Sequence, residues 1–99
     1  MGKDPAFLFY PGDWTQGTQA YTFEEKGAYI TLLCEQFERN ILTEDIIKRL
    51  LGLRYKTVWT VIKEKFKHNG TGFYNERLRE EKEKRKKYSE SRANNRRKK

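Results

Sequence analysis

The chain has 99 residues, of which 35% are hydrophobic and 36% are charged, and its formal net charge is +8. A chain of this length forms one small domain at most. Residues 1–75 are nearly neutral, whereas residues 76–99 hold most of the excess positive charge. This distribution predicts a folded domain over residues 1–76 and a basic Arg/Lys-rich extension over residues 77–99 that binds a polyanion.

Several classes of protein are excluded by simple features of the sequence. The longest apolar run covers residues 6–10, well short of the roughly 20 residues that span a bilayer, so we expect no membrane helix and no signal peptide. Cys34 is the only cysteine and His68 the only histidine. One chain therefore holds no internal disulfide and no zinc site of four Cys/His ligands, and we expect a cytoplasmic protein.

The first predicted element is a short strand at residues 7–10, which are rich in aromatic side chains. A tight turn is expected at residues 11–13, because proline, glycine and aspartate are favoured there. Residues 15–19 are expected to form a polar loop. The aromatic side chains of residues 7–10 are interpreted as core, but for Tyr10 and Trp14 a platform that stacks single-stranded bases remains an equal alternative.

The first helix is predicted to begin after Thr22, because Thr22 and Glu25 match the capping-box pattern, and to end near Arg39 or Asn40. Its apolar positions follow a helical period. Cys34 lies among them, so we interpret it as a small core residue. The predicted apolar face consists of Phe23, Ala28, Tyr29, Ile30, Leu32, Leu33, Cys34 and Phe37.

Two further helices are predicted, joined by a short connector. Thr43 caps the first of them and Gly52 ends it. A new helical period begins at Tyr55 and places Tyr55, Val58, Trp59, Ile62 and Phe66 on one face. Two helices joined by about three residues that include a glycine match the helix-turn-helix pattern.

A β-hairpin is predicted next, because Asn69 and Gly70 favour the backbone conformations of a tight hairpin turn. A strand, three helices and a hairpin are the element order of a winged helix. We therefore predict a mainly α (α+β) fold, a winged helix-turn-helix with a β-hairpin wing, in which the strand at residues 7–10 completes a small sheet beside the wing.

The basic extension is predicted to be helical to about residue 88 and disordered beyond it when unbound. Acidic side chains stand four residues before basic ones at Glu80 and Lys84, at Glu81 and Arg85, and at Glu83 and Lys87. The remaining residues of the extension have little apolar surface to bury.

No arrangement typical of an enzyme is found, so we predict a non-enzymatic protein without a cofactor, a catalytic residue, a metal site or a small-molecule substrate. Cys34 and His68 are the only possible thiol and imidazole pair, and Cys34 lies on the predicted apolar face. The acidic residues are accounted for by helix starts and polar helix faces.

The best candidate site is the polar side of the third predicted helix together with the wing. Cations there bind phosphates and hydroxyls reach base edges, which favours contact with DNA. An ordinary solvated face is the alternative, and Glu64 beside it favours that alternative. The predicted DNA-binding residues are Arg54, Lys56, Thr57, Thr60, Lys63, Lys67 and His68 in this region.

The basic extension supplies a second set of DNA-binding residues. Its cations neutralise phosphates without reading sequence; a solubilising linker is the alternative, and a membrane surface is disfavoured because no apolar face accompanies the charge. The residues are Lys82, Lys84, Arg85, Lys86, Lys87, Arg92, Arg96 and Arg97.

Three blocks of the sequence resemble the YdaU-like domains encoded by bacteriophages and prophages. They are residues 3–14 (KDPAFLFYPGDW), residues 22–29 (TFEEKGAY), and residues 73–78 (FYNERL) with residues 87–92 (KYSESR). Members of this family resemble the winged-helix domains of phage replisome organisers, which bind origin DNA. The resemblance implies a replication-associated DNA-binding protein in a bacterial host, and it transfers no catalytic residue.

Other functions of the same fold stay open. The near-neutral charge of residues 1–75 favours a module that binds a host or phage replication or defence protein. A transcriptional regulator would use the same helix-turn-helix. We expect a monomer, because the sequence shows no heptad pattern.

Overall fold

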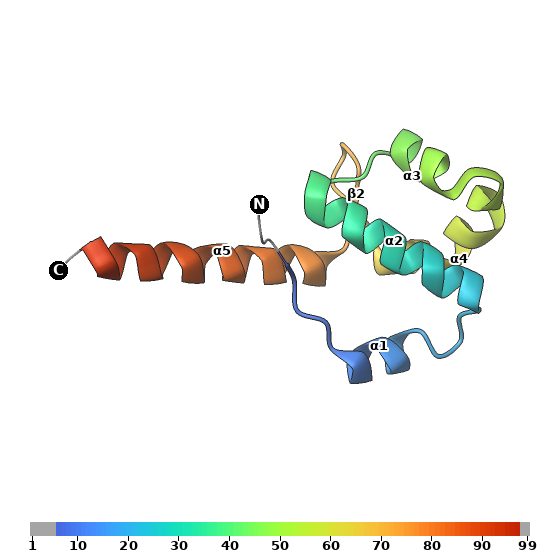
Figure 1. The fold of residues 1–99 in the computed structure, drawn as a ribbon. Coiled ribbons are helices and arrows are strands. Elements are labelled where there is room, and N and C mark those ends of the chain that lie inside the picture. Colours follow the sequence, from blue (N-terminus) through green and yellow to red (C-terminus); the bar gives the residue numbers. More distant parts are fainter. Residues whose placement is uncertain (1–5, 98–99) are drawn as a thin grey trace.

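The computed structural model describes the backbone of residues 6–97 and the side chains of residues 6–88. Over these residues the fold is mainly helical, with one small antiparallel sheet of two strands. The molecule measures 56 × 30 × 26 Å, and it is long because α5 (Glu76–Arg97) extends away from the helical body (Figure 1).

The N-terminal arm, residues 6–18, differs from its prediction. Residues 6–10 belong to no strand, and the predicted turn and loop are replaced by α1 (Pro11–Gly17). Pro11 stands at the start of α1, where its missing N–H is not needed, and Asp13 lies in the first turn. Trp14 then stacks on Tyr29 at a ring separation of 5.1 Å. Local turn preferences could not predict this contact, because it is made with a residue of α2.

The beginning and end of α2 (Phe23–Arg39) agree with the prediction. The Thr22 hydroxyl accepts a hydrogen bond from the Glu25 N–H, and the Glu25 carboxylate accepts one from the Thr22 N–H. The helix ends at Asn40, whose φ is 74°. The capping box predicted from the sequence is therefore confirmed.

The buried face of α2 contains most of the predicted apolar positions, but it excludes Phe23 and Cys34 and includes Gln36. Cys34 is exposed, and Phe23 is 90% exposed, so the interpretation of Cys34 as a core residue is wrong. Gln36 lies within the buried face because its amide is bonded to the backbone of Asn75. Cys34 lies about 200° around the helix from Gln36, which turns it away from the core. The buried residues of α2 are Leu32, Leu33, Gln36 and Phe37.

The second predicted helix is confirmed as α3 (Glu44–Leu51). The Thr43 hydroxyl accepts a hydrogen bond from the Ile46 N–H at 3.3 Å, and Ile47 and Leu51 are buried. Gly52 ends the helix with a φ of 58°, a backbone conformation that residues with a Cβ rarely adopt.

The next segment is helical throughout but irregular. It consists of η1 (Gly52–Arg54), the π-helical η2 (Tyr55–Trp59), α4 (Thr60–Ile62) and η3 (Lys63–Lys65). We call residues 55–65 the third helix. Its apolar side agrees with the prediction, because Val58, Trp59, Ile62 and the following Phe66 are buried.

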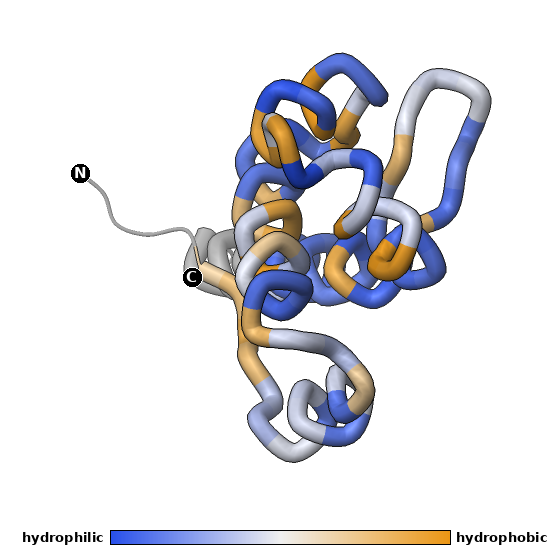
Figure 2. The backbone as a smooth tube through the Cα atoms, turned by 90° about the vertical axis from the view of Figure 1, so that its right-hand side faces the viewer, coloured by the Kyte–Doolittle hydropathy of each residue, from blue (hydrophilic) through white to orange (hydrophobic). Residues whose placement is uncertain are grey.

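The predicted hairpin is present as β1 (Lys67–His68) and β2 (Phe73–Tyr74), with Gly70 at a φ of 94°. The third segment beside it is Leu42, which exchanges backbone hydrogen bonds of 2.9 and 2.7 Å with Phe73. The prediction that residues 7–10 complete this sheet is therefore wrong. In the orthogonal view the hairpin and the N-terminal arm project on opposite sides of the body (Figure 2).

The basic extension is not separate from the folded part. Leu78 is buried in the core, and the Lys82 ammonium donates hydrogen bonds to the Phe37 carbonyl and to Asn40 Oδ1 at the end of α2. The packed part of the chain thus continues past residue 76 to Lys82. α5 is helical to Arg97, beyond the predicted helix end near residue 88.

A buried amide joins α2, the third helix and α5. Gln36 accepts a hydrogen bond from the Asn75 N–H at 2.6 Å and donates one to the Asn75 carbonyl at 3.1 Å. The Asn75 side chain donates to the Lys65 carbonyl at 2.8 Å and accepts from the Leu78 N–H at 2.9 Å, which caps α5. These bonds fix the direction in which α5 leaves the body.

Candidate nucleic-acid interface

The polar side of the third helix is exposed along its whole length. We call Arg54, Lys56, Thr57, Thr60, Lys63 and Lys67 the third-helix stripe, and all six residues are exposed. Lys56, Thr60 and Lys63 follow the spacing of one helical face, and Lys67 lies in β1, just beyond the end of the helix. Trp59, only 5% exposed, lies on the opposite side and packs on Phe66 and Phe73. The core therefore fixes which side of the helix meets the solvent.

The cations of the third-helix stripe differ in their partners. Arg54 forms an ion pair with Glu24, and Lys67 lies 3.5 Å from Glu76. No salt bridge involves Lys56 or Lys63 within the part of the chain whose side chains are described. Lys56 and Lys63 are consequently the cations of the stripe that need not give up an acidic partner to contact a phosphate.

The hydroxyls of the stripe are bonded to their own helix. Thr57 donates to the Arg54 carbonyl at 3.3 Å, and Thr60 donates to the Lys56 carbonyl at 2.7 Å. Both oxygens keep lone pairs, so they are placed to accept hydrogen bonds from base amino groups without breaking these contacts.

Glu64 beside the stripe has a partner inside the protein. It accepts a hydrogen bond of 2.6 Å from the Tyr21 hydroxyl. Burial of the phenol and this bond to Glu64 together raise the pKa of Tyr21 above its ordinary value. The contact joins the loop before α2 to the third helix.

His68 lies in the hairpin, next to the stripe. Its Nδ1 accepts a hydrogen bond from the Gly70 N–H at 3.1 Å, and its ring packs edge-on against Phe73 at 4.6 Å. His68 is exposed, and no hydrogen bond involves its Nε2 among the residues whose side chains are described, so the hairpin offers one imidazole edge to a partner.

The predicted DNA-binding residues of α5 fall into two groups. Lys82 is half-buried and bonded to the end of α2, so its ammonium is not free for phosphate. Lys84, Arg85, Lys86 and Lys87 are exposed. Arg92, Arg96 and Arg97 belong to the helical backbone of α5, and their side chains lie outside the described ones.

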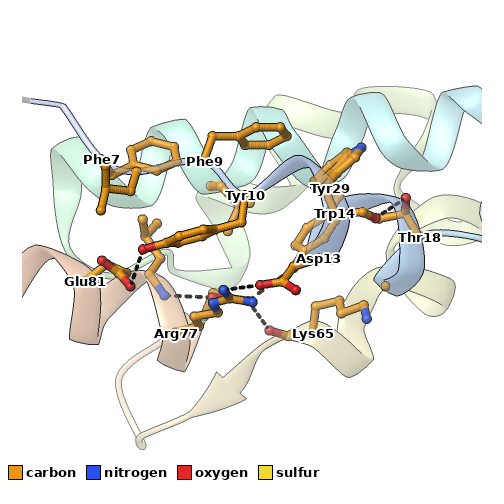
Figure 3. A pocket seen from close by; sticks show the side chains of 15 residues that line it. Phe7, Phe9, Tyr10, Asp13, Trp14, Thr18, Tyr29, Lys65, Arg77 and Glu81 are labelled. Carbon is orange, nitrogen blue, oxygen red and sulfur yellow. Dashed lines mark hydrogen bonds and ion pairs between the residues drawn. The ribbon is translucent and has the colours of Figure 1, made fainter.

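Sequence reasoning missed a pocket between the N-terminal arm, α2 and α5. Its volume is about 280 Å³ and its lining is mostly aromatic and aliphatic. Arg77 is ion-paired with Asp13, which raises the pKa of the guanidinium, and the Tyr10 hydroxyl donates to Glu81 at 3.3 Å (Figure 3). These partners are more than 60 residues apart in the chain, so no local pattern indicates the pocket.

The described residues contain no cluster of three or more His, Cys, Asp or Glu side chains that would hold a metal ion. No helix in the described range is long and apolar enough to cross a membrane. Comparison with family models, with curated proteins and with solved structures gives no match for this chain.

Proposed function

We propose that this chain is a non-enzymatic DNA-binding module of the winged-helix type, and that it serves DNA replication in a phage or prophage. The third helix would enter the major groove of duplex DNA, and the hairpin would lie over the backbone. The exposed cations of α5 would add contacts with phosphates that do not depend on sequence.

The observation that carries the proposal is the third-helix stripe. Trp59 and Ile62 are anchored in the core on one side of the helix, while Lys56 and Lys63 are exposed on the other and have no salt bridge to any side chain that the structure describes. A rigid helix that presents cations and hydroxyls is suited to groove contact. The replication role rests on the resemblance of the sequence to YdaU-like domains.

The test is fluorescence anisotropy on labelled duplex DNA over a salt series, with the double variant Lys56→Glu/Lys63→Glu. We expect affinity to fall roughly tenfold or more and the salt dependence to decrease by about two phosphate contacts. The melting temperature should stay nearly unchanged, because both side chains are exposed.

The control variant Lys26→Glu/Arg39→Glu reverses the same number of charges on α2. It should retain most of the affinity for duplex DNA. Equal binding by the wild type and by Lys56→Glu/Lys63→Glu would disprove docking through the third helix.

A second candidate function, binding of a host or phage replication or defence protein, is favoured by a separate observation. Phe23 is 90% exposed and Leu53 is fully exposed. Their chain neighbours Glu24 and Arg54 form an ion pair, so both apolar side chains lie at the same end of the molecule. Capture of a stoichiometric partner from nuclease-treated host lysate, lost in Phe23→Ser/Leu53→Ser, would support it; an unchanged capture pattern would count against it.

A further inference from the structure

The N-terminal arm displays large apolar side chains on a fixed support. Leu8, Phe9 and Tyr10 are 51%, 50% and 40% exposed. On either side of them the arm is anchored, because Phe7 packs on Phe37 at 5.3 Å and Trp14 stacks on Tyr29. The exposed rings therefore belong to an ordered surface of the protein.

Tyr10 lies directly against α5. The Arg77 guanidinium stands 4.9 Å from the centre of the Tyr10 ring, and the Tyr10 hydroxyl donates to Glu81 (Figure 3). Arg77 and Glu81 are four residues apart, so they define the side of α5 that faces the arm. The carboxylate of Glu81 accepts a hydrogen bond from Tyr10, and the carboxylate of Asp13 forms an ion pair with Arg77.

The same side of α5 continues beyond the arm with cations and a further ring. Positions 84, 85 and 88 follow 77 and 81 at helical spacing, and they are occupied by Lys84, Arg85 and Tyr88, which are all exposed. We call Tyr10, Arg77, Lys84, Arg85 and Tyr88 the aromatic-basic track. At 1.5 Å per residue, Tyr88 lies about 10 Å along α5 from Glu81.

The other side of α5 has different neighbours. Lys82 is bonded to the end of α2, and Lys86 lines a groove with Phe37 and Asn40. Lys86 thus carries the same charge as Arg85, one residue away, but lies toward α2 and not toward the arm. Comparison of the same charge reversal at Arg85 and at Lys86 therefore separates the effect of position on binding from the effect of net charge.

We propose that the aromatic-basic track binds a single strand of nucleic acid. Two exposed rings with cations between them match the chemistry of a single strand, whose bases stack on aromatic side chains and whose phosphates pair with Lys and Arg. A duplex offers no unstacked bases to such rings. The track lies on the arm and on α5, which extends away from the helical body (Figure 1). It shares no residue with the third-helix stripe, so it is a second binding surface and does not depend on the duplex-binding proposal.

The test is fluorescence anisotropy with labelled 12-nucleotide oligothymidylate and oligouridylate, in parallel with a hairpin duplex, on the full chain. We expect Tyr10→Leu and Tyr88→Leu each to weaken single-strand binding about five- to a hundred-fold. Tyr10→Phe should bind almost as the wild type does, since it keeps the ring and loses only the bond to Glu81. Comparison of the two oligonucleotides distinguishes DNA from RNA as the strand.

The charge-matched pair Arg85→Glu and Lys86→Glu gives the decisive comparison. Binding through the track predicts a larger loss for Arg85→Glu, whereas equal losses would mean that only the overall charge of α5 matters and would overturn the proposal. No binding of either oligonucleotide at low salt by a chain with a native circular-dichroism spectrum would also overturn it. Lys56→Glu/Lys63→Glu should leave single-strand binding unchanged, which separates this result from the test of the third helix.

Discussion

The two charged ends of this protein are built in different ways. The third-helix stripe comes from one continuous segment, residues 54–67, whose apolar residues face the core and so turn the cations outward. The aromatic-basic track is assembled from the arm and α5, with Tyr10 and Glu81 separated by 71 positions. Local periodicity is enough to build the first surface, and tertiary contacts are needed to build the second.

The two ends also differ in how their charge is neutralised. Arg54 and Lys67 at the third helix have acidic partners, whereas the run at residues 84–87 is exposed and contains only basic residues. Exposed ion pairs contribute little stability. Their main consequence here is that Arg54 and Lys67 must exchange partners to contact a phosphate, whereas no salt bridge involves residues 84–87 among the side chains that the structure describes.

The hydrogen bonds between Gln36 on α2 and Asn75 before α5 join the two surfaces, and we expect stability to be most sensitive to their loss. Gln36→Leu keeps the volume but leaves the Asn75 N–H and carbonyl without their partners, so we expect the free energy of unfolding to fall by about 2–4 kcal/mol. Urea denaturation measures this loss. Gln19→Leu, at an exposed loop position, is the matched control and should change stability little. Equal stability of the two variants would contradict the role of Gln36 as the joint.

The hairpin end can be perturbed alone at Gly72. A Cβ there would lie 2.7 Å from the Leu42 carbonyl oxygen, so Gly72→Ala should lower the free energy of unfolding by about 2 kcal/mol. Gly27→Ala meets no atom within 4 Å and lies inside α2, so it should raise stability by about 0.5–1 kcal/mol. Thermal unfolding of both variants checks the opposite signs, and a stabilising Gly72→Ala would contradict the contact with Leu42.

The attachment of α5 can be weakened at Lys82. Lys82→Met removes the hydrogen bonds to the end of α2 and the cation–π contact of the ammonium with the Phe37 ring, and we expect a loss of about 1 kcal/mol. Lys86→Met on the same helix is exposed and should change unfolding by much less. The amide chemical shifts of residues 37–40 should change only in Lys82→Met, and unchanged shifts there would argue against the contact.

The smallest effect is expected at Glu76, which links the hairpin to α5. Burial acts to raise the pKa of Glu76, but Lys67 and Arg79 outweigh it and hold the pKa below its ordinary value. Because the folded state has the lower pKa, this contribution to stability is present above the ordinary pKa of the carboxyl and is lost as the pH falls through the folded one. In Glu76→Gln the free energy of unfolding should decline less steeply below about pH 4.5. The same decline in the variant and the wild type would contradict a lowered pKa of Glu76.

Much of the helical body could be predicted from the sequence because its signals are local. The Thr22 capping box, the Thr43 cap, Gly52 and the Asn69 and Gly70 turn all act within a few residues, and the structure confirms each as a boundary. The apolar side of the third helix could also be predicted, because Val58, Trp59 and Ile62 follow the helical period and are buried.

The sequence by itself thus determined the three central helices, the hairpin and the outward side of the third helix, because capping and helical periodicity act over short distances. Only the tertiary structure decided the rest. The arm is helical where a turn was expected and packs Trp14 on Tyr29, Leu42 takes the place of residues 7–10 beside the hairpin, and on α2 Gln36 is buried while Cys34 is exposed. Each of these outcomes depends on a partner distant in sequence, and a polar amide can be buried where such a partner satisfies its hydrogen bonds.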